Sequence, residues 1–125
     1  MRWDALVFSV RHAVRDPFIR WNAIASGVVY LAVSVFFLWS ITPAVRQTGL
    51  VTLHYNTYIG IDDVRAWPWM FFIPGVVLFV IVFDTMVALI LFQKDRLAAR
   101  AIIALESGTV LVWAVGIYFL TRINL

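Results

Sequence analysis

The stretch that decides the fold is Met70–Phe92, which reads MFFIPGVVLFVIVFDTMVALILF. It contains one acidic residue, Asp84, and no basic residue. A helix needs roughly 20 predominantly apolar residues to cross the ~30 Å hydrocarbon layer of a membrane, and this run is long enough. Because backbone polar groups in lipid must be paired within the segment, residues 70–92 are predicted to form a transmembrane helix.

Two further apolar runs lie on either side of this stretch. The first covers residues 21–41 and ends at Thr42 and Pro43, and the last covers residues 101–120, interrupted by Glu106. The chain is 63% hydrophobic and 14% charged, against roughly 45–50% and about 25% in soluble domains. This composition excludes a soluble globular domain, a disordered chain and, with no cysteine, a disulfide scaffold. We therefore predict an all-α membrane protein with three transmembrane helices and a single domain over residues 1–125.

Basic residues flank the three runs unevenly. If each run crosses the membrane, one side holds Arg2, Arg11, Arg15, Arg20, Lys94, Arg96 and Arg100, and the other holds Arg46, Arg65 and Arg122. The positive-inside rule then predicts a multi-pass protein of the inner cell membrane, with a cytoplasmic N-terminus and an extracytoplasmic C-terminus.

Residues 1–16 are predicted to form a separate N-terminal amphipathic helix. Apolar residues recur at helical spacing through Trp3, Leu6, Val7, Val10 and Val14. Such a helix is expected to lie on the cytoplasmic leaflet with its arginines near anionic lipid, and Pro17 is expected to end it. The expected membrane-surface contacts are Arg2, Trp3, Arg11, Arg15 and Arg20. A simple anchor and a docking surface for a partner protein both remain open.

The outer segment, residues 43–68, is too long for a simple connector, so we expect a structured extracytoplasmic loop. Alternating β-branched and aromatic residues between positions 51 and 62 predict one or two short extended stretches. Gly60 followed by Asp62 and Asp63 predicts a turn at that point.

Within this loop, Leu53–Asp62 reads LHYNTYIGID and leads into an aromatic-rich segment that reaches Pro74. This pattern resembles a family of small Patescibacteria-like bacterial membrane proteins of unestablished function, and the resemblance implies three spans with the motif after the first. The loop is also similar, more distantly, to that of SdpI-type membrane proteins, which act in toxin immunity and signalling. Where the pattern has Asn in the second helix, this chain has Asp84. The matching positions are His54, Tyr55, Asn56, Tyr58, Gly60, Asp62 and Pro74.

Asp84 and Glu106 are the acidic residues within the predicted spans. They lie about 11 residues before and about 10 after the turn near residues 95–96, so a helical hairpin puts them at nearly the same depth. An ionised carboxylate there costs about 2.5–3.5 kcal/mol on insertion scales, so compensation is expected. This cost could be offset by a proton shared between the two acids, by a nearby arginine or by nearby hydroxyl groups. The arginines are Arg20, Arg96 and Arg100, and the hydroxyls are those of Thr85, Ser107 and Thr109. The pair predicts either an ion or proton path or a hydrogen-bonded clamp between helices.

Small residues on the third span indicate close helix packing. Ala104, Gly108 and Val112 lie four residues apart, and Gly116 follows on the same face. Such a face suits contacts within one subunit or between subunits.

Catalytic motifs are absent from the sequence. It has no glycine-rich phosphate loop, HExxH or GxSxG motif, and its two histidines, His12 and His54, are predicted on opposite sides of the membrane. We expect no enzyme activity, no cofactor, no bound metal and no nucleic-acid partner. The leading hypothesis is a self-assembling or accessory structural subunit, whose partners are the lipid bilayer and either copies of itself or another membrane protein. The alternatives are an oligomeric ion or proton channel that uses Asp84 and Glu106, and an SdpI-like immunity or sensor protein that recognises an external ligand through the His54–Asp62 loop.

Overall fold

The computed structural model describes residues 3–56 and 58–125, without the side chains of Tyr55, Asn56 and Asp62. The chain is mostly helical, as predicted. Its elements are α1 (Trp3–Arg15), α2 (Pro17–Thr48), β1 (Leu50–Asn56), β2 (Gly60–Ala66), a short 3₁₀ helix η1 (Trp67–Phe71), α3 (Phe72–Leu91) and α4 (Arg96–Asn124). Three helical segments are long and apolar enough to cross a membrane: Pro17–Thr48, Trp67–Leu91 and Arg96–Asn124.

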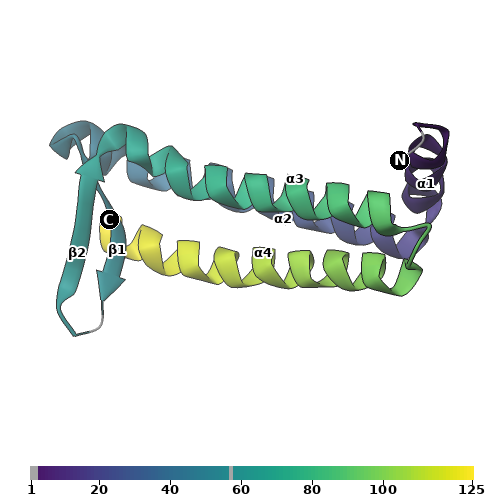
Figure 1. Cartoon of the computed structure of the whole chain (residues 1–125). Coiled ribbons are helices and arrows are strands. Elements are labelled where there is room, and N and C mark those ends of the chain that lie inside the picture. Colours follow the sequence, from purple (N-terminus) through teal and green to yellow (C-terminus); the bar gives the residue numbers. More distant parts are fainter. Residues whose placement is uncertain (1–2, 57) are drawn as a thin grey trace.

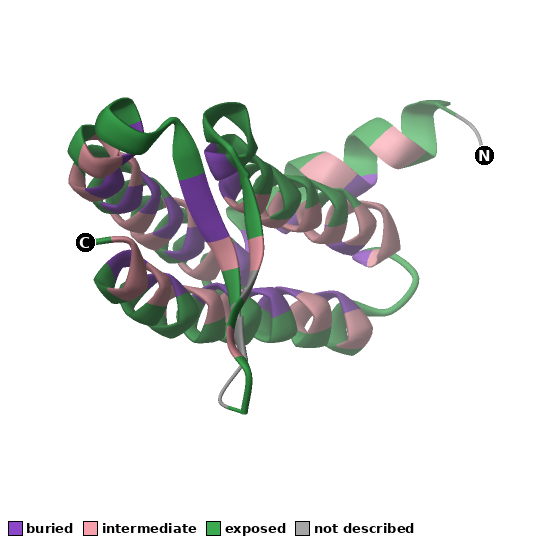
Figure 2. Ribbon diagram, turned by 90° about the vertical axis from the view of Figure 1, so that its left-hand side faces the viewer, coloured by how far each residue is buried: buried purple, intermediate pink, exposed green. Residues whose placement is uncertain are grey.

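Helices α2, α3 and α4 pack side by side as a bundle, with α3 antiparallel to the other two (Figure 1). The β-hairpin and the C-terminus lie at one end, which we call the hairpin end. Helix α1 lies at the opposite end, which we call the α1 end, and its axis crosses that of the bundle (Figures 1 and 2). The bundle therefore separates two structurally different ends.

Helix α2 extends beyond the predicted span of residues 21–41. It continues through Pro43 to Thr48, so the helix is longer than the apolar run that ends at Thr42 and Pro43. In apolar helices a proline is tolerated where neighbouring helices support the segment, and Ile41 and Val45, on either side of Pro43, are buried in the bundle. The helix ends instead at Gly49, whose φ of 71° suits glycine and whose N–H donates to the carbonyl of Val45 at 2.8 Å.

The other helices also differ from their predicted bounds. Helix α3 covers residues 72–91 within the predicted 70–92, because Met70 belongs to η1. Helix α4 is longer than the predicted 101–120 at both ends. The side chain of Asp95 accepts a hydrogen bond from the N–H of Ala98 at 2.8 Å and so allows α4 to begin at Arg96. These differences arise at helix ends, where capping matters more than hydropathy.

The segment predicted as an outer loop, residues 43–68, contains the end of α2, an antiparallel hairpin and the start of η1. The hairpin agrees with the predicted extended stretches, but the turn lies earlier than predicted. Gly60, with a φ of 81°, already pairs with Asn56, and Asp63 pairs with His54. The turn therefore ends at Gly60 and does not begin there. The positive φ of Gly60 directs the chain into β2.

The buried residues form two apolar clusters, one near each end. The cluster at the α1 end consists of Ala13, Ile19, Ala88, Phe92, Ala99 and Ile103. The cluster at the hairpin end consists of Phe37, Ile41, Val45, Val51, Met70 and Ile117. Along α4, buried residues recur at intervals of three, four or seven positions, as in a coiled-coil seam. Glu106 occupies one of these seam positions, between the two clusters.

Candidate functional site in the bundle core

The candidate site is centred on Glu106, whose side chain is fully buried on the inner seam of α4. Its Oε2 accepts a hydrogen bond from the hydroxyl of Thr85 on α3 at 3.0 Å. Its Oε1 is also buried and has no hydrogen-bond partner in the described structure. A buried carboxylate oxygen without a partner is costly, and buried polar groups left in that condition are uncommon in folded proteins.

Hydroxyl and amide groups on α2 and α4 extend the site. The Ser26 and Ser107 hydroxyls lie 3.0 Å apart, and Ser107 also donates to the carbonyl of Ile103 at 3.0 Å. The Asn22 side-chain oxygen lies 3.5 Å from Ser107, a long contact. We call this set the buried polar cluster after its two buried members, Ser26 and Glu106. The half-buried residues around them are Asn22, Asp84, Thr85 and Ser107. The cluster joins all three helices of the bundle through side-chain polar groups.

Asp84 lies at the edge of this cluster and is half-buried. It is close enough for its carboxylate to interact electrostatically with that of Glu106. Its neighbour Thr85 makes the direct hydrogen bond to Glu106. The structure therefore brings Asp84, Thr85, Glu106 and Ser107 to one level of the bundle, which is the set that the sequence singles out.

The arginines suggested as compensation for the two acids point elsewhere. Arg100 and Arg96 both pair with Asp16, at 2.8 and 3.5 Å. Arg20 lies over the ring of Trp21, 5.4 Å from its centroid. Thr109 donates to the carbonyl of Leu105 on its own exposed helix face. Compensation for Glu106 thus comes from hydroxyl groups, and the expectations for the arginines and for Thr109 are wrong.

Towards the hairpin end the polar character of the core fades. The Tyr30 hydroxyl donates to the carbonyl of Pro74 at 3.1 Å, and its ring stacks on Trp113 with centroids 5.5 Å apart. Beyond this level Phe37, Ile41 and Ile117 fill most of the core. Two hydroxyls are also buried there, those of Ser34 and Thr121, and Thr121 donates to the carbonyl of Ile117 on its own helix. Within the described chain, the buried polar cluster does not continue through the apolar cluster to the hairpin end.

Asp16 is a buried carboxylate that our sequence reasoning did not single out. It is 3% exposed and caps α2 by accepting from the N–H groups of Phe18 and Ile19 at 3.1 and 3.3 Å. Burial alone would raise the pKa of Asp16. The hydrogen bonds from Arg100 and from the backbone lower the pKa by more than burial raises it, so the net pKa lies below the ordinary value. An Asp followed by Pro is typical of a helix start and is the signal that identifies this residue.

Helix α1 is fastened to the bundle through its small residues. The Ser9 hydroxyl donates to the carbonyl of Leu89 at 2.7 Å and accepts from the N–H of Gln93 at 3.3 Å, and Ala13 is fully buried. Trp3 is 80% exposed. Arg11, Arg15 and Arg20 are also exposed, whereas Arg2 lies outside the described residues. Of the predicted membrane-contact residues, Trp3, Arg11 and Arg15 are thus exposed on the docked helix α1, and Arg20 is exposed at the start of α2.

The outer-loop motif falls on the hairpin. His54 on β1 lies opposite Asp63 on β2, and Tyr58 and Gly60 lie at the turn. The motif side chains of Tyr55, Asn56 and Asp62 lie outside the described part of the chain. Asp63 pairs with Arg65 at 2.6 Å on the surface. Among the described residues, no group of three or more His, Cys, Asp or Glu side chains is arranged to hold a metal ion.

Asn124, near the end of α4, attaches the hairpin to the bundle. Its side-chain oxygen accepts from the N–H of Thr52 at 2.8 Å, and its side-chain nitrogen donates to the carbonyl of the same residue at 2.9 Å. Asn124 therefore occupies the place of a neighbouring strand beside β1. No local sequence pattern marks it, because its partners are 72 residues away.

The small residues of α4 line an open groove on the outside of the bundle. The groove has a volume of about 540 Å³ and includes Ala104, Gly108 and Val112. A Cβ added to Gly108 or to Gly116 would meet no atom within 4 Å. These residues therefore serve no close helix contact within the described chain.

Comparison of the chain with protein-family models, curated proteins and solved structures finds no match. The resemblance carried by Leu53–Pro74, and the immunity or sensor role that it implies, stay predictions.

Proposed function

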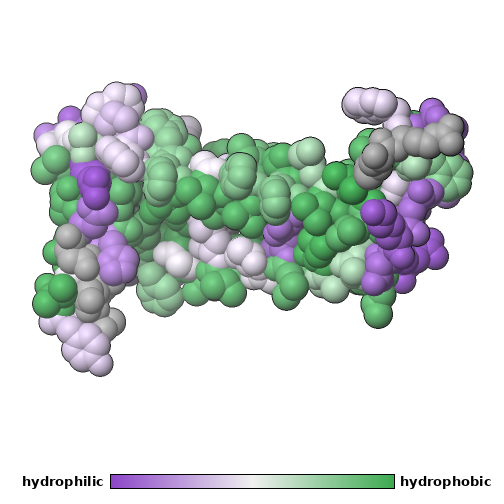
Figure 3. Space-filling view, viewed as in Figure 1, coloured by the Kyte–Doolittle hydropathy of each residue, from purple (hydrophilic) through white to green (hydrophobic). Residues whose placement is uncertain are grey.

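We propose that this chain is an integral membrane protein whose bundle spans the bilayer three times, with the N-terminus in the cytoplasm. Three helical segments of sufficient length and hydropathy support this proposal. The middle of the bundle surface is largely apolar, and hydrophilic residues gather at its two ends (Figure 3). The α1 end is the more basic one, as expected of the cytoplasmic side.

The protein acts as a non-enzymatic structural subunit that assembles with itself or with another membrane protein. The observation that carries this function is the open groove on α4, in which a Cβ added to Gly108 would meet no atom of the described chain. The same holds at Gly116, further along α4 and outside this groove. In lipid, small residues allow helix backbones to approach closely, and such faces are typical of helix–helix interfaces.

Native mass spectrometry of the detergent-extracted protein tests this function. We expect a defined homo-oligomer or a complex with a second protein. Replacing Gly108 by Ile fills the groove, so the dissociation constant should rise at least about tenfold, equivalent to about 1.4 kcal/mol of lost packing. The matched control is Gly75→Ile, because Gly75 on α3 is also exposed and has no atom near an added Cβ. A wild-type monomer without a partner, or equal effects of both substitutions, would contradict the proposal.

The second candidate is an oligomeric ion or proton channel. The unpartnered Oε1 of Glu106, next to Asp84, favours it, because intramembrane carboxylates commonly mark ion or proton pathways. The apolar cluster at the hairpin end closes the core of a single chain, so a continuous path needs a second copy.

Proton flux into liposomes tests the channel. If the channel exists, Glu106→Gln should reduce flux at least about tenfold, the size expected for loss of a proton-transfer group. Ser107→Ala, which removes a hydroxyl of the same cluster, should leave most of the flux. Absence of any flux in the wild-type protein would leave Glu106 as part of an interhelical clamp.

A further inference from the structure

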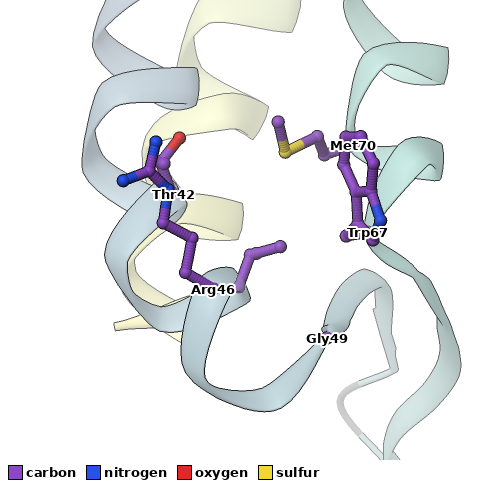
Figure 4. Close-up of a pocket in the computed structure, with 6 residues that line it drawn as sticks. Thr42, Arg46, Gly49, Trp67 and Met70 are labelled. Atoms are coloured by element: carbon purple, nitrogen blue, oxygen red, sulfur yellow. The ribbon is translucent and has the colours of Figure 1, made fainter.

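A pocket of about 440 Å³ opens at the hairpin end of the bundle. One wall is the last part of α2 and the opposite wall is η1 (Figure 4), so the pocket lies at the ends of the apolar segments Pro17–Thr48 and Trp67–Leu91. Its volume falls within the roughly 300–1,000 Å³ that is usual for ligand sites. The pocket is lined by Thr42, Val45, Arg46, Gly49, Trp67 and Met70.

Arg46 supplies the positive charge of this pocket. None of the ion pairs among the described residues includes it, although Arg65 at the same end of the molecule is paired with Asp63. Figure 4 shows its side chain running back along α2, so that the guanidinium lies beside Thr42 and not beyond the helix end. If the bundle spans a membrane, the Arg46 side chain points from the helix end towards the hydrocarbon layer, where an unpaired cation is costly. The guanidinium of Arg46 is therefore available to pair with an anion from outside the chain.

The remaining walls are apolar and aromatic. Val45 and Met70 are buried in the cluster at the hairpin end, and the Met70 side chain extends across the pocket towards α2 (Figure 4). Trp67 stands at the start of the Trp67–Leu91 segment, and tryptophan prefers the border between headgroups and hydrocarbon. A ligand that fits both features carries an anionic head beside an apolar chain.

We propose that this pocket binds one acidic phospholipid. The guanidinium of Arg46 pairs with the lipid phosphate, and one acyl chain lies between α2 and η1 against Val45 and Met70. Guanidinium and phosphate form strong charge-assisted hydrogen bonds, which a zwitterionic lipid offers less favourably because its own cation competes. The site rests on the proposed membrane insertion, since only the bilayer presents this ligand at that depth.

Lipid retention in native mass spectrometry tests the site. The protein is extracted from vesicles of equimolar phosphatidylglycerol and phosphatidylcholine with identical acyl chains. We expect the wild type to retain phosphatidylglycerol in preference to phosphatidylcholine. Arg46→Gln should weaken this retention about fivefold, the effect of one cationic side chain on acidic-lipid binding. Arg46→Lys should keep most of it, and Thr42→Phe should reduce it by filling the pocket.

The matched control is Arg122→Gln, which removes the same charge at the same end of the bundle from a residue that does not line the pocket. Equal retention by the wild type and Arg46→Gln, an equal loss in Arg122→Gln, or no preference between the two lipids would each overturn the site. A protein recovered without detergent in the aqueous fraction would overturn membrane insertion and the site together. A membrane-inserted protein without lipid preference would overturn the site alone.

Discussion

At the scale of single residues, two buried carboxylates are accommodated in different ways. Asp16 lies at the α1 end, where two arginines and two backbone N–H groups surround it. Glu106 lies midway along the bundle, accepts a hydrogen bond from Thr85 and lies near the Ser26 hydroxyl, and its Oε1 makes no hydrogen bond of ordinary geometry. Asp16 is therefore a fully paired structural group. Glu106 is the residue whose unsatisfied oxygen leaves room for a function or for a partner from another subunit.

The pairing of Asp16 predicts a pH dependence of stability. Its folded-state pKa lies below the ordinary value, so the stabilisation is complete above the ordinary aspartate pKa of about 3.9 and is lost as the pH falls through the lowered folded-state pKa. Asp16→Asn keeps a good capping residue but removes the charge. We expect it to cost about 1 kcal/mol near neutral pH, because the arginine partners are partly exposed to solvent.

Thermal unfolding in detergent, followed by circular dichroism at several pH values, measures this effect. The wild type and Asp16→Asn should differ near neutral pH and converge in acid. A difference that is unchanged at the lowest pH would show that the charge of Asp16 is not what stabilises the joint between α1, α2 and α4.

At the scale of elements, hydropathy predicted which segments are helical, but local chemistry decided where they end. Helix α2 passes through Pro43 and stops only at Gly49, and α4 starts where Asp95 can cap it. The apolar stripe of α1 is divided, with Trp3, Val7 and Val14 exposed while Leu6 and Val10 are half-buried. A membrane-surface helix and a helix docked through Ser9 use different faces, so α1 is able to serve both roles at once.

At the scale of the whole molecule, the two ends differ in charge and in structure. The α1 end carries most of the arginines, whereas the hairpin end carries the paired strands and the Arg46 pocket. A bundle with one basic end has a defined preference for its direction of insertion. The N-terminal helix and the hairpin are therefore expected to face opposite aqueous compartments.

Single-cysteine labelling tests this orientation, because the chain contains no cysteine of its own. Gln47→Cys lies at the hairpin end and Gln93→Cys lies in the turn at the α1 end, and both positions are exposed. In intact cells a membrane-impermeant maleimide should label Gln47→Cys at least about tenfold more than Gln93→Cys. Permeabilised cells, in which both should react, are the control. Preferential labelling of Gln93→Cys would reverse the topology.

The sequence by itself determined the mostly helical class, the three long apolar segments and the level at which Thr85 meets Glu106, because these follow from hydropathy and helical rise. Tertiary structure decided the rest. Asn124 beside Thr52, Ser9 beneath α3 and the arginines around Asp16 are contacts between residues 72 to 84 positions apart. The outward orientation of Gly108 was equally hidden, since a small residue has the same local pattern whether it faces its own bundle or another chain. Such contacts depend on how helices rotate and pack, which periodicity alone leaves open.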